Sequence, residues 1–566
     1  MMQALSLRMR HAWMEPLAIL AIAVTVVLGI LVLYPAGLLV LGSLGHALSG
    51  ASGSGWIKLI HEPRLLSALG NTLALTLAYV GISMPIAIGI SWLIARTDLP
   101  AGKWLEFGFW LSFFLPPLAV VQGWILMLDP SFGVINSAWQ ALFGRPGPFD
   151  IFSWWGIVFA HLVTTAVSAK VMLMTPAFRN LDGAIEEAAM VAGDRVLSML
   201  RRIVVPVMAP TLLVTLVLSI VKSLESFEIE LVLGTPKRID VYSTQIYRLI
   251  RSDPPEFSAA AAMGVTMIAA MLLLAAVQRR MVAKRVYATL GGKPQGRLLP
   301  LGGARWPLFA LVCTVLVILV ALPIASLVAS TFMTMYGYFQ IAEPWTLAHW
   351  REVIGDAVFV DSLFNTLRLA LGVALFAMTV GFLVAYLLTY VQGRWARALD
   401  TVSWIPVSMP GVLFSMAWLG MMLSLPWLQP LYGTTMALVL IIGLATLTMS
   451  AQLIRGALGQ LSLELAEAST LSGATRLSTV ARILLPLVLQ SVLVTGVVGF
   501  ISAGRNIGHI ALLVTSDNRP LSIMQLEFLS EGRYEAASVV GVIVVALTAI
   551  VAIVARAFGL RAGPRA

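Results

Sequence analysis

Long runs of apolar residues, separated by short polar segments, dominate the amino-acid sequence. Runs such as 17–42, 69–95 and 307–330 almost exclude charged residues. Each exceeds the ~20 residues that a helix needs to cross a bilayer core, and the pattern recurs along the chain, so we expect about twelve membrane-spanning helices. We place them at 17–42, 69–95, 105–128, 153–176, 207–226, 258–277, 307–330, 363–390, 401–424, 436–455, 487–503 and 536–555. The pattern therefore predicts an all-α integral membrane protein.

Composition agrees with this interpretation and adds an orientation. Hydrophobic residues make up 59% of the chain and charged residues 11%, against about a quarter charged in soluble proteins, which excludes a soluble enzyme. The net charge of +10 does not indicate nucleic-acid binding, because the Lys and Arg residues lie mostly in short segments between spans. They gather on the side of the N-terminus, so the positive-inside rule predicts that both termini are cytoplasmic.

The chain contains a long internal repeat. Several positions of the first half return in the same order in the second: Asn71-Thr72-Leu73 as Asn365-Thr366-Leu367, and Pro116 and Trp124 as Pro410 and Trp418. We therefore expect two tandem six-span domains at 1–277 and 307–566, joined by a basic cytoplasmic linker at 278–306. Because six is an even number, both domains begin on the same side of the membrane. A pseudo-two-fold axis along the membrane normal should therefore relate them and leave a path between them.

One repeated motif lies between the fourth and fifth spans of each half, at about 178–206 and 458–486; we call these the first and second motif segments. Each has a glutamate, two small residues, a glycine, and then an isoleucine shortly before a proline. The positions are Glu187, Ala188, Ala189, Gly193, Ile203 and Pro206 in the first, and Glu467, Ala468, Ser469, Gly473, Ile483 and Pro486 in the second.

This spacing predicts two short helices that are separated by the glycine, which permits a tight turn. Small residues on one face of the first helix allow a partner to approach closely. Two such elements on one side of the membrane suit a two-fold partner with a cleft for each. The alternative is an ordinary interfacial helix lying on the lipid headgroups, which explains one copy better than two.

The two motif segments resemble the EAA loops of binding-protein-dependent ABC importer permeases, with Val205 and Ser469 as mild departures. The resemblance implies two fused permease domains in a bacterial inner membrane, whose loops couple to two copies of an ABC ATP-binding subunit. It also implies a periplasmic substrate-binding protein as partner. Gly102-Lys103 and Gly292-Lys293 are not followed by Ser or Thr, so no phosphate-binding loop is present. We expect ATP and Mg²⁺ in the partner subunits, and no cofactor, metal ligand or catalytic residue in this chain.

The fused arrangement is similar to importers of ferric iron, thiamine, polyamines and phosphonates, and the segment 224–236 looks most like the ferric-iron type. Near the outer ends of the fifth spans, polar residues are candidates for the substrate pathway. They are Glu225 and Glu228 in the first half and Arg505, Asn506 and His509 in the second. A simpler interpretation is that Glu225 pairs with Lys222, three residues earlier on the helix.

Two other classes of protein remain as alternatives. A secondary transporter driven by an ion gradient also favours two parallel halves, and it predicts ionisable residues near the membrane midplane. The sequence places none there convincingly. A membrane-embedded enzyme is less favoured, because no catalytic grouping converges on one side.

Overall fold

The computed structural model describes residues 2–44, 55–283, 298–462, 465, 468–469 and 471–557. Within these residues the chain is helical throughout, apart from turns and two isolated bridges. Nine helices there are long and apolar enough to cross a membrane, and three bent helix pairs raise the number to twelve if each pair forms one span. All twelve coincide with the predicted spans, which confirms an all-α membrane protein.

Fifteen α-helices form the first half. They are α1 (Met2–Ser43), α2 (Gly55–His61), α3 (Pro63–Arg96), α4 (Gly102–Phe114), α5 (Pro117–Leu128), α6 (Val134–Phe143), α7 (Trp154–His161), α8 (Val167–Arg179), α9 (Gly183–Val191), α10 (Val196–Met199), α11 (Val205–Val207), α12 (Ala209–Leu224), α13 (Glu228–Leu233), α14 (Tyr242–Arg251) and α15 (Phe257–Ala283). A π-helical turn, Leu162–Ala166, joins α7 to α8 in one span.

The second half repeats this order. Its described helices are α16 (Arg305–Leu316), α17 (Leu322–Ser330), α18 (Ala348–Gly355), α19 (Ala357–Tyr390), α20 (Arg394–Trp404), α21 (Gly411–Ser424), α22 (Thr435–Leu458), α24 (Arg476–Thr479), α25 (Leu485–Arg505), α26 (Leu521–Ser530) and α27 (Tyr534–Ala557). A π-helical turn, Val480–Leu484, makes α24 and α25 one continuous span.

The third span of each half is broken at a proline. The chain bends by 95° between α4 and α5 at Pro116, and by 111° before α21 at Pro410. Both prolines have an extended backbone conformation, and a proline also disfavours a helical conformation in the residue before it. The repeated prolines therefore give both halves the same broken span, which apolar run length alone does not reveal.

The fifth spans differ between the halves. In the first half the helix bends by 75° between Val207 and Ala209, whereas residues 476–505 of the second half form one continuous span. Pro210 lies in the first turn of α12, and the repeat places Gln490 at the corresponding position. Because a proline interrupts the helical hydrogen bonds to the preceding turn, this single difference explains the bend.

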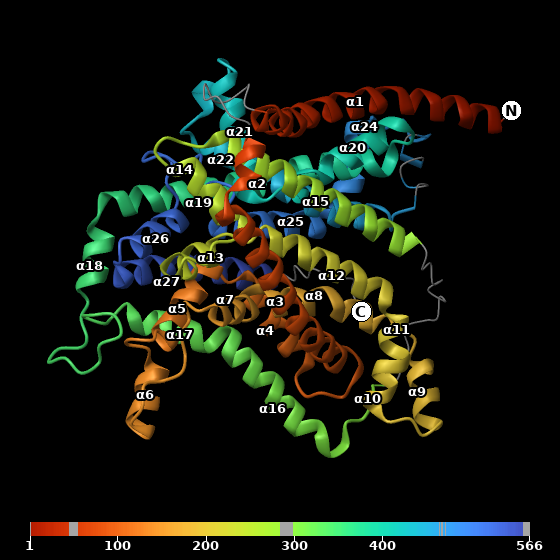
Figure 1. Cartoon of the computed structure of the whole chain (residues 1–566). Coiled ribbons are helices and arrows are strands. Elements are labelled where there is room, and N and C mark those ends of the chain that lie inside the picture. The colour runs from red at the N-terminus through yellow and green to blue at the C-terminus, as the bar shows by residue number, and fades with distance from the viewer. Residues whose placement is uncertain are drawn as a thin grey trace.

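The first span of each half packs against the other half. α1 lies against α20 and α21, and α17 lies against α5. Figure 1 shows α1 in red along one side of the molecule and α16 and α17 in green along the opposite side, next to α4 and α5. Each half therefore packs its first span against the other half. This reciprocal packing is consistent with a pseudo-two-fold arrangement.

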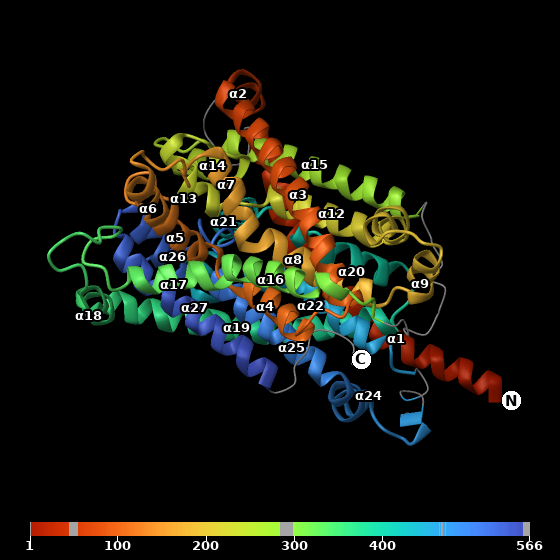
Figure 2. The same ribbon diagram turned by 90° about the horizontal axis from the view of Figure 1, so that it is seen from below.

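The two ends of the bundle are distinct in both views. α9 and α10 lie at one end of the bundle, and α24 lies at the same end but apart from them; we call this end the motif end. α14, α18 and α26 lie at the opposite end, the far end (Figures 1 and 2). Both motif segments are thus on the same side of the protein.

The repeated Asn-Thr pair fixes the far end of each half. The hydroxyl of Thr72 accepts a hydrogen bond from the Tyr242 amide at the start of α14 (2.9 Å). The hydroxyl of Thr366 accepts one from the Leu521 amide at the start of α26 (2.8 Å). In both cases a long span satisfies a helix-start amide that has no partner within its own helix. The repeat therefore preserves a structural hydrogen bond.

The interface between the halves predicts a strict size limit at Gly123 of α5. A Cβ at this position would lie far inside van der Waals contact with the backbone carbonyl of Pro323 in α17. We expect Gly123→Ala to destabilise the protein by about 1–3 kcal/mol, because the two helices must separate. Thermal unfolding of the detergent-purified chain measures the effect.

The matched control is Gly89→Ala in α3, where nothing lies within 4 Å of the added Cβ. This variant should unfold at the parental temperature or slightly above it, since alanine favours helix more than glycine does. Equal unfolding temperatures for the two variants would contradict the close packing of α5 on α17.

Candidate functional site: the motif end and the path between the halves

The first motif segment is a helix, a glycine turn and a second run of helix. The carboxylate of Asp182 accepts a hydrogen bond from the Ala184 amide (3.0 Å) and so begins α9. After α9 the backbone turns at Gly193, whose φ is +82°. The Asp194 amide then donates to the Ala189 carbonyl (3.0 Å). A glycine adopts this left-handed conformation at least cost, which explains its place in the motif.

The second motif segment makes the same turn. Gly473 has a φ of +79°, and the Ala474 amide donates to the Ser469 carbonyl (3.2 Å). Thr475 then begins α24 by accepting from the Ser478 amide (3.3 Å). Glu467 lies outside the described residues.

Burial follows the same pattern in both segments. Ala188 and Ala468 are exposed, and the next small residues, Ala189 and Ser469, are buried. The later positions correspond as well, with the isoleucines half-buried and the prolines exposed: Ile203 and Pro206 in the first segment, Ile483 and Pro486 in the second. Glu187 is exposed. Both motif segments therefore present one alanine outward while the next small residue packs inward, and the first segment also presents Glu187 outward.

Exposed apolar side chains surround the motif. Val191 is 90% exposed, Leu477 82% and Leu471 74%, and all three lie in or beside the glycine turns. Large exposed apolar groups at the end of a bundle, beside its glycine turns, are typical of a surface that a partner covers.

Sequence analysis overlooked one residue of the first motif segment. Glu186, directly before Glu187, is 1% exposed and pairs with Arg96 at the end of α3 (2.6 Å between Nη2 and Oε2). Two adjacent glutamates gave no sign of which one is buried, because the partner lies in another span.

The candidate pathway residues gather where α12 and α25 end. A guanidinium nitrogen of Arg505 donates to the Phe113 carbonyl at the break between α4 and α5, and the guanidinium carbon lies 4.9 Å from the Phe113 ring centroid. Burial raises the pKa of the Glu228 carboxyl to about 7, and the nearby Arg505 guanidinium opposes this rise. Glu228 and Arg505 of opposite halves are thus near enough for their charges to influence each other.

The other candidates have closer partners. Glu225 pairs with Lys222 (2.7 Å), as the simpler interpretation expects. Asn506 accepts hydrogen bonds from the amide and ring Nδ1 of His509, both at 3.1 Å. His509 lies against Gly411 at the start of α21, where a Cβ would meet the imidazole.

A buried ionisable pair in the first half also escaped sequence analysis. His161 and Glu230 are 5% and 3% exposed, with 2.8 Å between Nε2 and Oε1. The imidazole stacks on Tyr79 at 4.3 Å, and Ser226 donates to the carboxylate (2.6 Å). In the sequence, His161 and Glu230 are visible only as isolated polar residues within apolar runs. That they pair with each other depends on the tertiary fold.

A cavity of about 550 Å³ opens between the halves toward the far end. Its polar lining comes from both halves: Tyr247 and Arg251 of α14, Glu527 and Ser530 of α26, Glu531 after α26, and Tyr534 of α27. Burial raises the pKa of the Glu527 carboxyl, and Arg519, 3.1 Å away, opposes the rise. We call this cavity the vestibule.

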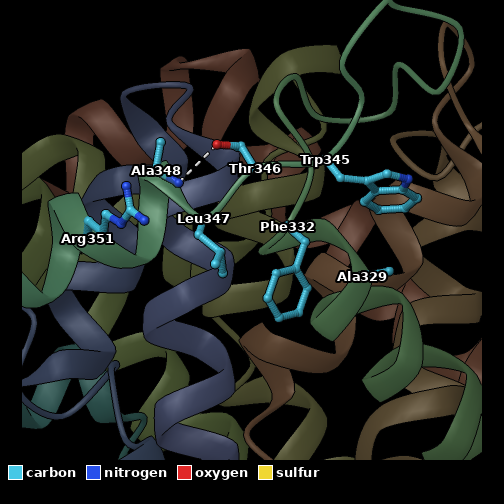
Figure 3. A pocket seen from close by; sticks show the side chains of 7 residues that line it. All are labelled: Ala329, Phe332, Trp345, Thr346, Leu347, Ala348 and Arg351. Carbon is cyan, nitrogen blue, oxygen red and sulfur yellow. Dashed lines mark hydrogen bonds between the residues drawn. The ribbon is translucent and has the colours of Figure 1, made fainter.

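A second hollow, of about 730 Å³, belongs to the second half alone. It lies between the end of α17 and the start of α18, and Phe332, Trp345 and Arg351 are among the side chains that line it (Figure 3). Because only one half forms it, it does not continue the path between the halves. Among the described residues, no group of three or more His, Cys, Asp or Glu side chains could hold a metal ion.

Comparison with known proteins identifies the type of protein. Residues 377–563 match the model of the binding-protein-dependent transport system inner membrane component. A ferric transport system permease protein of Actinobacillus pleuropneumoniae is 24% identical over 508 residues, covering 88% of this chain and 72% of that protein. A probable ABC transporter permease protein of Sinorhizobium fredii is 26% identical over 490 residues, covering 82% of each.

Among solved structures, a bacterial ABC transporter involved in alginate import is 22% identical, with a TM-score of 0.39 over 44% of this chain and 88% of that chain. The sequence relatives thus span nearly the whole chain, whereas the family model covers its second half. Residues 377–563 thus carry a permease domain of binding-protein-dependent transport systems, and the chain as a whole resembles ABC permeases of the ferric transport type.

Proposed function

We propose that this chain is the membrane permease of an ATP-driven importer. Two copies of an ABC ATP-binding subunit dock on the motif end, and a periplasmic substrate-binding protein delivers cargo to the far end. One observation carries the proposal: the two motif segments share a fold and a burial pattern and lie on the same side of the protein. Two equal docking elements suit a partner with two equal clefts.

This arrangement assigns the membrane sides. The motif end faces the cytoplasm of a bacterial cell, because the basic linker and most other Lys and Arg residues lie on that side of the predicted topology. Both termini then lie in the cytoplasm, and the vestibule opens toward the periplasm. The chain itself holds no cofactor in this scheme; ATP and Mg²⁺ are bound by the partner subunits.

Ferric iron is the cargo that we propose. The support is the similarity to ferric transport permeases over most of the chain. The carboxylates Glu527 and Glu531 in the vestibule would attract a cation electrostatically. Thiamine and polyamines, which are also cations, and phosphonates are the alternative cargoes.

Transport then follows from a two-state equilibrium. ATP binding brings the two ATP-binding subunits together, and the motif segments move with them, so the spans change between inward-open and outward-open arrangements. Glu187, which is exposed, and its sequence counterpart Glu467 are the motif glutamates in this scheme, and Gly193 and Gly473 shape the turns of the two segments.

The buried pair of His161 and Glu230 favours one rival, an ion-gradient-driven transporter, since ionisable residues inside a membrane often mark proton or ion paths. The two mechanisms differ in their energy source. Uptake of radioactive ferric iron should stop when cells are depleted of ATP while the proton and sodium gradients are clamped. Uptake that persists under those conditions would favour the rival.

The motif glutamates provide the direct test. We expect the double variant Glu187→Gln with Glu467→Gln to lose most ATP-driven iron uptake in proteoliposomes that contain the full transporter, because both docking elements lose their outward charge. The ratio of iron transported to ATP hydrolysed should fall at least about fivefold, the lower range of coupling effects between sites.

The matched control removes one acidic residue per half at the same end but outside the motif. It is Glu106→Gln with Asp400→Asn, which breaks the partly exposed pairs with Arg179 and Arg455. Surface pairs contribute little, so this variant should transport at nearly the parental rate. Parental transport in the motif variant would overturn the role of the motif segments.

The closeness of the Glu228 and Arg505 charges predicts an energetic link between the halves. Each single change, Glu228→Gln or Arg505→Gln, should destabilise the purified chain, because it removes a favourable charge interaction between two half-buried side chains. The double variant should be more stable than the sum of the single effects predicts, by about 0.5–3 kcal/mol. Denaturant or thermal unfolding in detergent measures this coupling, and additive effects would show that the two side chains do not interact.

A further inference from the structure

Glu186 is the most buried acidic side chain of the first motif segment. One carboxylate oxygen accepts from Nε of Arg96 (2.8 Å) and lies 2.6 Å from its Nη2, and the other accepts from the Trp92 indole (3.1 Å). Arg96 and Trp92 are 5% and 4% exposed. Both belong to the last turns of α3, so this cluster, which we call the latch, ties α9 to a membrane span.

The latch also touches the start of the second half. The Arg96 carbonyl accepts from the Leu299 amide (2.9 Å), and the Asp98 amide donates to the Leu299 carbonyl (3.1 Å). The Asp98 carboxylate accepts from the Leu301 amide (2.8 Å), and α16 begins four residues later, at Arg305. The end of α3 is therefore bonded both to the first motif segment and to the chain that leads into α16.

The second half has no counterpart of these charges. The repeat places Tyr386 and Tyr390 where the first half has Trp92 and Arg96, and Ala466 where it has Glu186. Ala466 lies outside the described residues, but an alanine carries no carboxylate in any conformation. The two tyrosine rings lie 5.0 Å apart between centroids. The latch is thus confined to the first half.

A buried ion pair such as Arg96 and Glu186 resists separation. Two opposite charges that are almost completely buried hold each other in place, because separating them would leave each charge in a poorly hydrated site. The charge-assisted hydrogen bond from Nε of Arg96 to one carboxylate oxygen and the indole hydrogen bond to the other further restrict the carboxylate geometry. α9 therefore cannot move far without the end of α3 unless the latch breaks.

We propose that Arg96 and Glu186 are positioning residues that transmit movement of the first motif segment to α3 and to the start of the second half. The two motif segments are then mechanically unequal: the first is fixed to the end of α3 by a buried ion pair, and the second carries Tyr386, Tyr390 and Ala466 at the positions that correspond to the latch. This proposal rests on the proposed function for its role in transport, but the latch itself is independent of it.

The first experiment measures the latch in the purified full-length chain. We expect Glu186→Gln and Arg96→Gln to speed hydrogen exchange of the α9 amides at least about tenfold relative to the parent, because loss of one buried partner weakens the docking of α9. Arg96→Lys, which keeps the charge, should lie between the parent and Arg96→Gln.

The control is Glu106→Gln in α4, outside the motif segments, which removes the ion pair with Arg179 (2.7 Å) near the same end. That pair is partly exposed, so its loss should leave α9 exchange within about twofold of the parent. Unchanged α9 exchange in Glu186→Gln would overturn the latch, whatever this protein transports.

The second experiment measures coupling in the assembled transporter with its ATP-binding subunits and binding protein, and ferric iron as probe. For Glu186→Gln the ratio of iron transported to ATP hydrolysed should fall at least about fivefold, while ATP hydrolysis continues. Glu106→Gln should keep the parental ratio.

Faster α9 exchange with a parental coupling ratio would overturn the transmission role and leave the proposed function intact. The proposed function fails in a different way, when the parental chain itself shows no ATP-dependent uptake. The two hypotheses are therefore separable in one set of measurements.

Discussion

The structure depends on one constraint: within a membrane, every backbone polar group must find its partner inside the protein. Phe113 shows how the chain meets it. In a regular helix its carbonyl would accept from the amide of residue 117, but Pro117 has no N–H. The guanidinium of Arg505, from the other half, donates to that carbonyl instead. A helix break in one half is thus stabilised by a charged side chain of the other, which places the break at the interface between them.

The same backbone plan carries different chemistry in the two halves. Both third spans break at a proline, and both Asn-Thr pairs hold a far-end helix. In contrast, corresponding positions of the repeat carry different residues: Glu225 of the first half corresponds to Arg505 of the second, and Glu230 corresponds to Ile510. Where α12 and α25 end, a cargo that passes between the halves would therefore meet acidic groups of the first half and basic or imidazole groups of the second, whereas the vestibule carboxylates Glu527 and Glu531 belong to the second half. Such asymmetry is expected where a single small solute meets both halves at once.

Apolar run length and the internal repeat were sufficient to predict the spans, and the spacing of the motif predicted its helix, turn and helix. The bends were not predictable in the same way, because Pro116 and Pro210 lie inside runs whose hydrophobicity continues across them. The burial of Glu186 was not predictable either. Its neighbour Glu187 is chemically identical, and only Arg96, distant in the sequence, distinguishes them. Pairing between distant spans is a property of the tertiary fold, so the buried pair of His161 and Glu230 was also missed.

The two motif segments share their turns and burial, but only the first is joined to α3 by the latch. They should therefore respond differently to the same movement of the partner subunits. Two identical partner subunits would apply the same displacement to both motif segments, since these share their turns and burial. The first segment would pass it directly to α3 and toward α16 through the latch, whereas the second segment has no latch at the corresponding positions Tyr386, Tyr390 and Ala466. Because coupling between sites is reciprocal in free energy, a cargo that shifts α3 would then influence the first docking site more than the second. A fused chain can evolve such a difference because its two halves vary independently, which a permease built from two identical subunits cannot do.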